Sequence, residues 1–184
     1  FKWINQYGCI NDTADILLAD DDRTYKLIDE MLATLAECFT TRKIHIGMDE
    51  AYMVGLGKYR DKHGDTDRFE IINRHLHKVC DIADKYGFKP MIWSDMFCKL
   101  AVSSSDYYST ADLEAIRKKA NLPENLTLVY WDYYSTDYNH YCNMIEKNKA
   151  FARPVVFAGG AWTWTGFMPS NKYSLEITAP AIKA

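Results

Sequence analysis

The chain has 184 residues, of which 48% are hydrophobic and 26% charged, a composition that predicts a globular protein and excludes a disordered one. Its 22 basic and 25 acidic residues are spread along the length with no basic run, so we expect no nucleic-acid partner. No apolar stretch approaches the roughly 18 residues of a membrane span, and the N-terminus lacks a signal-peptide pattern. We therefore expect no membrane partner.

Five cysteines are widely spaced and form no C-x-x-C pair: Cys9, Cys38, Cys80, Cys98 and Cys142. This spacing favours reduced thiols and a cytoplasmic protein. Cys38, Cys80 and Cys142 fall inside helical patterns near apolar positions. We therefore expect them to be buried thiols with a structural role and assign no nucleophile among the cysteines.

The first predicted helix covers residues 24–39, where apolar side chains recur at helical spacing at Ile28, Leu32, Leu35 and Phe39. Three aspartates at 20–22 precede it and suit the positive end of a helix dipole. The pattern predicts an amphipathic helix.

An apolar run at 43–48 reads as a strand, and a second helix follows at 67–86. Asp67, with Glu70 three residues later, is typical of a helix start, and Gly87 is typical of a helix end. Between them, apolar side chains step by three and four at Phe69, Ile72, Leu76, Val79, Ala83 and Tyr86.

Three more short apolar runs, near 89–94, 126–131 and 153–159, are predicted to be strands. Helical patterns lie between them at about 111–120 and 138–149. The last twelve residues are expected to begin a further helix that Pro180 interrupts.

Alternating helices and continuous apolar strands predict a parallel sheet, either open and doubly wound or closed as a (β/α)₈ barrel. Every strand ends in polar or aromatic residues, which favours the barrel, because all strand ends of a barrel meet at one mouth. A complete barrel takes about 250 residues and eight strands. We therefore predict the α/β class and a partial (β/α)₈ TIM barrel of about four βα units, with residues 1–184 forming a fragment of a single barrel.

Two adjacent acids, Asp49 and Glu50, follow the strand at 43–48. Neighbouring residues of a regular strand face opposite sides, so these two can share a pocket only where the strand has ended. Close carboxylates raise one another's pKa, which suits a general acid. An ordinary solvated acid pair, or a metal site with His45, fits the spacing as well.

These residues resemble a known family. Residues 45–50 are similar to the H-x-G-x-D-E signature of family 20 glycoside hydrolases, the β-N-acetylhexosaminidases, and the resemblance continues through 93–95, 130–134 and 159–164. It implies hydrolysis of terminal β-linked GlcNAc or GalNAc, a carbohydrate partner, and no cofactor or metal.

The resemblance also implies a mechanism in which the carbonyl oxygen of the substrate's 2-acetamido group attacks the anomeric carbon. An oxazolinium ion forms and the configuration is retained, with no enzyme carboxylate attacking the sugar. Glu50 is implied as the general acid and base. Asp49 is implied to hold the acetamido N–H and to stabilise the positive charge on the ring.

Several other residues are predicted to bind the substrate. Indole rings suit the C–H face of a sugar and the acetamido methyl group, and the tryptophans expected to wall the site are Trp93, Trp131, Trp162 and Trp164. Trp162 and Trp164 are expected to share one face of a strand, with Thr163 on the other, and core packing is the alternative for at least one of the four.

Polar roles follow from the same resemblance. Tyr133 is expected to bind the acetamido oxygen and Asp132 the sugar hydroxyls. His45 is expected to orient a neighbouring acid, and Asp95 either to support the site or to cap a loop. The family's arginine on the first strand, and the tryptophan and acid of the eighth strand, have no counterpart, so the isolated chain is expected to be weakly active or inactive.

Two other functions fit the sequence. A non-catalytic barrel that binds carbohydrate would keep the aromatic walls without the chemistry. A metal-dependent barrel hydrolase would use His45, Asp49 and Glu50 as ligands.

Overall fold

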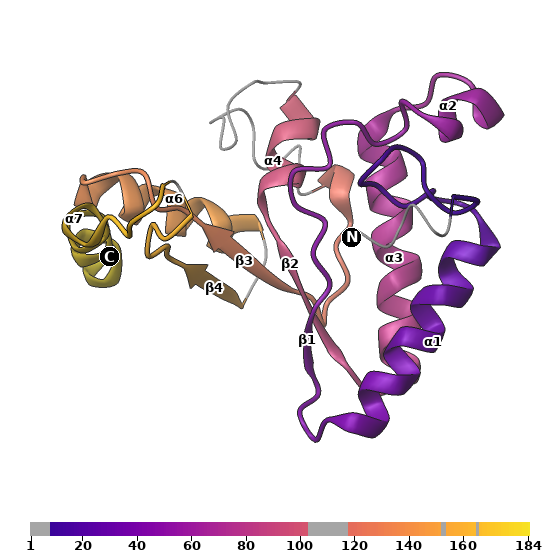
Figure 1. Cartoon of the computed structure of the whole chain (residues 1–184), viewed down its shortest axis with the longest axis horizontal. Coiled ribbons are helices and arrows are strands. Elements are labelled where there is room, and N and C mark those ends of the chain that lie inside the picture. The colour runs from indigo at the N-terminus through magenta and orange to yellow at the C-terminus, as the bar shows by residue number, and fades with distance from the viewer. Residues whose placement is uncertain (1–7, 103–117, 152–153, 165) are drawn as a thin grey trace.

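The computed structural model describes residues 8–102, 118–151, 154–164 and 166–184 (Figure 1). In chain order its elements are α1 (Asp22–Cys38), β1 (Lys43–His45), α2 (Lys58–His63), α3 (Arg68–Lys85), β2 (Lys89–Trp93), α4 (Asp95–Val102), β3 (Thr127–Trp131), α6 (Tyr138–Phe151), β4 (Val155–Ala158) and α7 (Asn171–Lys183). The helix predicted at 111–120 falls mostly outside the described residues.

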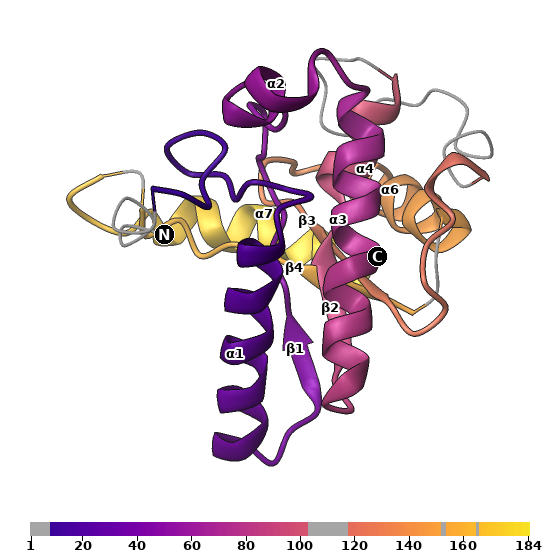
Figure 2. The same ribbon diagram turned by 90° about the vertical axis from the view of Figure 1, so that its right-hand side faces the viewer.

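The strands form a parallel sheet in the order β1-β2-β3-β4. Helices α1 and α3 lie side by side against the β1 and β2 part of the sheet, and α6 packs on β3 and β4 (Figures 1 and 2). The predicted α/β fold of four βα units in a partial barrel is confirmed.

The register divides the sheet into two faces, because paired residues of parallel strands point to the same side. One face meets the helices: Ile92 is paired with Leu128, and Tyr130 with Phe157, and these side chains belong to the hydrophobic core. The other face carries Trp93 and Trp131. The predicted site residues on the strands therefore share the face opposite the main helix layer.

Helix α3 begins and ends as predicted. The Asp67 carboxylate accepts a hydrogen bond from the backbone N–H of Phe69, as a helix N-cap does. At the other end Gly87 has a φ of +71°, which glycine adopts without strain. Its N–H bonds to the Asp84 carbonyl and that of Phe88 to the Ala83 carbonyl, and this pairing ends the helix in a Schellman motif.

Helix α1 is capped by Asp21, whose carboxylate accepts from the Arg23 backbone N–H at 3.0 Å and pairs with the Arg23 guanidinium at 2.7 Å. Asp21→Ala is expected to lower the free energy of unfolding by about 1 to 2 kcal/mol. Hydrogen bonds from Arg23 hold the pKa of Asp21 at about 2, against an ordinary 3.8. Because the folded-state pKa is lowered, this contribution is present above pH 3.8 and is lost as the pH falls through 2.

Urea denaturation followed by circular dichroism at pH 7 and at pH 2 measures both effects. The matched control is Asp22→Ala, one residue along, since Asp22 is exposed and lies in the first turn without serving as the cap. Equal losses for the two variants would contradict the capping role.

Two expectations about the elements were wrong. The strand near 43–48 ends at His45, because Gly47 and Met48 have φ of 77° and 70° and turn the chain out of the sheet. Helix α7 runs through Pro180 to Lys183, with Ile177 and Ala181 buried on either side of the proline. Packing of that face offsets the hydrogen bond that the proline lacks.

The cysteine and helix-face predictions hold in part. Cys80 is buried as predicted, whereas Cys38 is exposed, because it is the last residue of α1, and Cys142 is half-buried. Phe39 lies beyond the end of α1 and is 56% exposed, so it does not continue the buried face. Within the described residues, no helix combines the length and the apolar character that crossing a bilayer requires.

Candidate active site at the ends of the strands

The acid loop (residues 47–50) follows β1 and carries the predicted pair. Its backbone departs from ordinary geometry, since Gly47, Met48 and Glu50 have φ of 77°, 70° and 48°. Such angles are costly for Met48 and Glu50, which have side chains, and persist only where neighbouring groups hold the backbone in place. The side chains of Asp49 and Glu50 are exposed.

Asp95, the first residue of α4, anchors the acid loop. It is fully buried, and its Oδ2 accepts from the Glu50 backbone N–H at 3.2 Å. Its Oδ1 accepts from the Trp131 indole Nε1–H at 3.1 Å. Burial raises the pKa of the Asp95 carboxyl, and the nearby negative charge of Asp49 adds to this effect. One carboxylate thus links the ends of β1, β2 and β3.

His45 and Trp93 lie together on the sheet face opposite the main helix layer. Their ring centroids are 4.2 Å apart. Burial lowers the pKa of His45, while the negative charge of Asp49 acts in the opposite direction. His45 is therefore within electrostatic range of Asp49. Its Nδ1 accepts a hydrogen bond from the Gly47 N–H.

Tyr133 lies between the acids and the tryptophans. Its ring stacks on Trp131 with centroids 5.4 Å apart. Burial raises the pKa of Tyr133 to about 12, and the negative charges of Glu50 and Asp49 contribute to the rise. The hydroxyl therefore stays protonated at neutral pH within electrostatic reach of both carboxylates.

Asp132 lies deeper than its predicted role requires. It is 5% exposed and accepts hydrogen bonds from the Tyr130 hydroxyl at 2.7 Å and from the Tyr134 backbone N–H at 3.1 Å. His140 Nε2 lies 2.7 Å from the same carboxylate. Asp132 thus braces the end of β3 through its own neighbours.

Trp162 and Trp164 lie on the loop after β4, since that strand ends at Ala158, and the predicted strand alternation is wrong here. The two indoles nevertheless stack, with centroids 5.4 Å apart, and Trp162 has a φ of 36°. The Trp162 indole N–H donates to the Tyr133 carbonyl at 2.7 Å. The loop thereby adds its aromatic rings to the Tyr133 side of the site.

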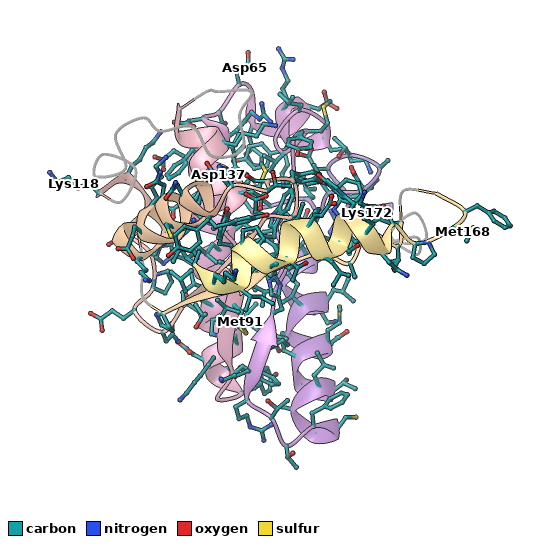
Figure 3. All side chains as sticks on the ribbon, turned by 90° about the vertical axis from the view of Figure 1, so that its left-hand side faces the viewer. Asp65, Met91, Lys118, Asp137, Met168 and Lys172 are labelled. Carbon is teal, nitrogen blue, oxygen red and sulfur yellow. The ribbon has the colours of Figure 1, made fainter. Side chains whose placement is uncertain are left out.

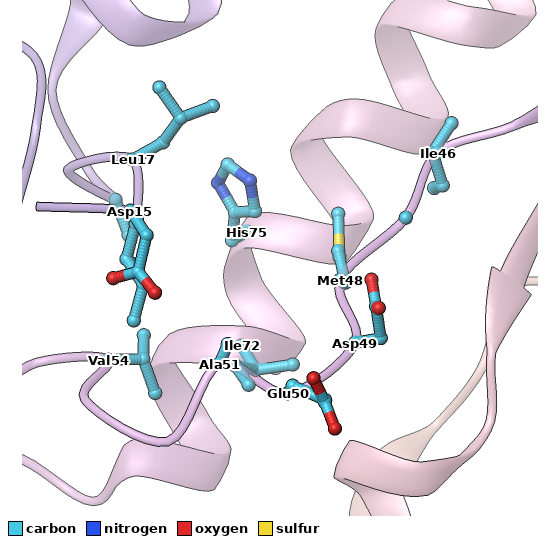
Figure 4. A pocket seen from close by; sticks show the side chains of 13 residues that line it. Asp15, Leu17, Ile46, Met48, Asp49, Glu50, Ala51, Val54, Ile72 and His75 are labelled. Atoms are coloured by element: carbon cyan, nitrogen blue, oxygen red, sulfur yellow. The ribbon is translucent and has the colours of Figure 1, made fainter. Parts of the chain in front are cut away.

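A cavity of about 410 Å³ lies beside the acid loop (Figure 4). Leu17 and Asp15 of the N-terminal segment form one wall, Met48 forms the opposite one, and His75 reaches in from α3. Burial lowers the pKa of His75 to about 4, so the imidazole is neutral at pH 7. In Figure 4 the carboxylates of Asp49 and Glu50 lie on the Met48 side and point in different directions from the loop.

Some residues that shape the site were missed by the sequence reasoning. Tyr52 donates its hydroxyl to Glu50 Oε1 at 3.4 Å, and buried Asp12 holds the chain just after the acid loop. Neither stands in a motif, and only the position of Tyr52 two residues after Glu50 could have pointed to it. Across the described part of the chain, no three His, Cys, Asp or Glu side chains converge as a potential metal site.

No protein-family model and no curated protein matches this chain. Solved structures do match it. The family 20 β-N-acetylhexosaminidase from Streptomyces coelicolor A3(2) gives a TM-score of 0.48 at 19% identity, covering 81% of this chain and 23% of that one. The N-acetyl-β-hexosaminidase from Streptomyces plicatus, in complex with thio-NAglucal, gives 0.45 at 18% identity, covering 77% and 21%.

An inactive mutant of the family 20 exo-β-N-acetylglucosaminidase from Vibrio harveyi gives a TM-score of 0.46 at 18% identity and covers 76% of this chain and 18% of that one. The chain therefore spans about a fifth of the length of these solved structures. Over that part, the chain is similar in structure to family 20 β-N-acetylhexosaminidases, the family that its sequence motifs resemble.

Proposed function

We propose that this chain is part of the catalytic barrel of a β-N-acetylhexosaminidase that removes terminal non-reducing GlcNAc or GalNAc. The observation that carries the proposal is the placement of the acid pair. Asp49 and Glu50 stand on a loop whose backbone is tied to buried Asp95 and, through it, to Trp131. Acids, tryptophans and a protonated tyrosine thus gather at the ends of neighbouring strands, where barrel enzymes carry their sites.

In the proposed reaction the substrate supplies its own nucleophile. The acetamido carbonyl oxygen forms a bond to the anomeric carbon while the bond to the leaving oxygen breaks, and Glu50 gives that oxygen a proton. Glu50 then takes a proton from the water that opens the oxazolinium ion. Asp49 accepts the acetamido N–H and faces the positive charge that develops, an interaction that is stronger in the transition state than in the ground state.

The surrounding residues have matching roles. Trp93 offers an apolar face for the sugar ring and the acetamido methyl group, and Trp162 and Trp164 extend the aromatic wall. Trp131 is only 8% exposed and stacks on Tyr133, so its role is to support that side of the site. Tyr133 keeps its proton, since its pKa is about 12, and so can donate to the acetamido oxygen.

Two polar residues act more indirectly. Asp132 would bind a sugar hydroxyl only in exchange for one of its present partners. Of the two side chains among them, His140 is the more exposed, and Tyr130 is buried. His45, whose Nδ1 accepts the Gly47 N–H, would orient Asp49 by a hydrogen bond from its other ring nitrogen.

The 2-acetamido group provides the test, because in this mechanism it is a reactant. The full-length protein that contains these residues should hydrolyse an aryl β-N-acetylglucosaminide, and should act on the matching aryl β-glucoside at least about 10³-fold more slowly. Equal rates, measured as kcat/KM from release of the aryl alcohol, would contradict the proposal. The isolated 184-residue chain should be weakly active or inactive, since it supplies only part of the barrel.

Two other functions give different results in the same assay. Sugar binding without turnover in the full-length protein would identify a carbohydrate-binding barrel, for which the stacked indoles are suited. Loss of turnover in excess chelator would identify a metal-dependent hydrolase instead.

A further inference from the structure

We propose that Asp95 is the positioning residue for the acid loop, holding the Glu50 backbone so that its carboxyl group can protonate the leaving oxygen. This inference rests on the proposed function. It assigns Asp95 no contact with substrate, because the side chain is fully buried and acts through Glu50.

The contacts of Asp95 are suited to this task. Both carboxylate oxygens are used as acceptors, one by the Glu50 backbone N–H at 3.2 Å and the other by the Trp131 indole N–H at 3.1 Å. Asp95 begins α4, so its backbone belongs to a helix. Trp131 ends β3, and the acid loop is thereby attached to two regular elements rather than one.

The loop needs such an anchor because its conformation is strained. Met48 and Glu50 adopt φ of 70° and 48°, and residues with side chains stay in this region only when their surroundings hold them there. The Glu50 N–H belongs to the peptide bond between Asp49 and Glu50, which lies within this strained stretch. Without its acceptor, the peptide before Glu50 is free to turn, and the carboxyl group turns with it.

A carboxylate is required, since an amide of the same shape fails at one of the two contacts. Asparagine has one acceptor oxygen and one NH₂ group, so at position 95 a donor would face either the Glu50 N–H or the Trp131 N–H. Burial raises the pKa of Asp95 and the charge of Asp49 adds to the rise, whereas the Trp131 and Glu50 N–H donors act in the opposite direction and favour the ionised form that accepts at both oxygens.

The test uses leaving groups of different quality in the full-length protein. A general acid matters most when the leaving oxygen is basic and needs a proton, and little when it is already a good leaving group. Asp95→Asn is therefore expected to lower kcat about 10²-fold for phenyl β-N-acetylglucosaminide but only a few-fold for the 2,4-dinitrophenyl substrate. KM should change little, because Asp95 does not touch the sugar.

Asp12→Asn is the matched control. Asp12 is also buried, and its two oxygens also accept two N–H groups, from Gly55 at 2.6 Å and Tyr59 at 2.8 Å. The control variant should lose stability as Asp95→Asn does, yet slow the two substrates by the same factor.

The outcomes separate this inference from the proposed function. If the wild-type protein hydrolyses neither substrate, the proposed function fails. If it hydrolyses both and Asp95→Asn slows them equally, the positioning role is overturned while the proposed function stands. Should Asp95→Asn not fold, Asp95→Ser replaces it, because the shorter serine side chain removes both contacts without adding volume. This variant should show a dependence on the leaving group of the same sign, and equal slowing would overturn the proposal.

Discussion

Glu50→Gln in the full-length protein should lower kcat for a phenyl β-N-acetylglucosaminide by about 10³-fold while leaving KM and the fold unchanged. Glutamine has the same shape as glutamate but neither gives nor takes a proton. The backbone N–H of residue 50 still bonds to Asp95, and the side-chain oxygen still accepts from the Tyr52 hydroxyl, so the loop keeps its conformation.

Steady-state hydrolysis and thermal unfolding together measure the effect. Glu124→Gln is the control, since Glu124 is an exposed glutamate just before β3, at the opposite ends of the strands. Hydrolysis at the wild-type rate by Glu50→Gln would remove Glu50 from the reaction and leave the solvated acid pair as the explanation of the motif.

Gly57→Ala is expected to lower the free energy of unfolding by about 3 kcal/mol. A Cβ at this position would overlap the carbonyl oxygen of Asp12 and lie 2.8 Å from its carbonyl carbon, both backbone atoms. The Asp12 backbone has little freedom to move, since its carbonyl accepts the Lys58 N–H at 3.1 Å and its carboxylate accepts the Gly55 N–H at 2.6 Å. The φ of Gly57 is −107°, so the loss arises from the overlap and not from backbone strain.

Urea denaturation of the two glycine variants isolates this effect. Gly166→Ala adds a methyl group that meets no atom within 4 Å and should change the stability by a few tenths of a kcal/mol. A loss for Gly57→Ala no larger than that of the control would show that the Asp12 segment shifts freely. Because Gly57 lies on the segment that follows the acid loop, which Asp12 holds through Gly55 and Tyr59, the Gly57→Ala variant should also lose activity.

Local signals predicted α1, α3 and α6 well, but they missed the short helices α2 and α4 and most contacts between distant segments. Asp67, Glu70 and Gly87 marked both ends of α3, because caps and stops act within a few residues of the helix end. The strand alternation that placed Trp162 and Trp164 on one face was the wrong reason for a correct pairing, since the rings stack across a loop.

The anchor on the acid loop shows the limit of pattern reasoning. Glu50 and Asp95 are 45 residues apart, and their contact depends on β1 and β2 pairing in register. The sequence placed Asp95 at a strand end, where it could cap a loop or support the site, but which N–H groups it meets follows from the packing of α4 against the sheet. The early end of β1 could have been predicted from Gly47, because glycine within a strand pattern often marks the place where regular strand geometry breaks.

The loop between β4 and α7 carries exposed apolar side chains. Phe167 and Met168 precede α7 and are 106% and 78% exposed, and Figure 3 labels Met168 at the far end of this loop. Apolar atoms make up much of the surface of folded proteins, so such exposure is common.

Because each strand pairs with the strand that precedes it in the chain, the sheet can grow in step with synthesis on the ribosome. Each newly synthesised strand can pair with the edge of the sheet already formed, and its pairing needs no segment that is synthesised later. Asp95 leaves the ribosome soon after β2 and can then accept the hydrogen bond from the Glu50 N–H. The indole of Trp131 arrives some 35 residues afterwards and completes the attachment from the other side.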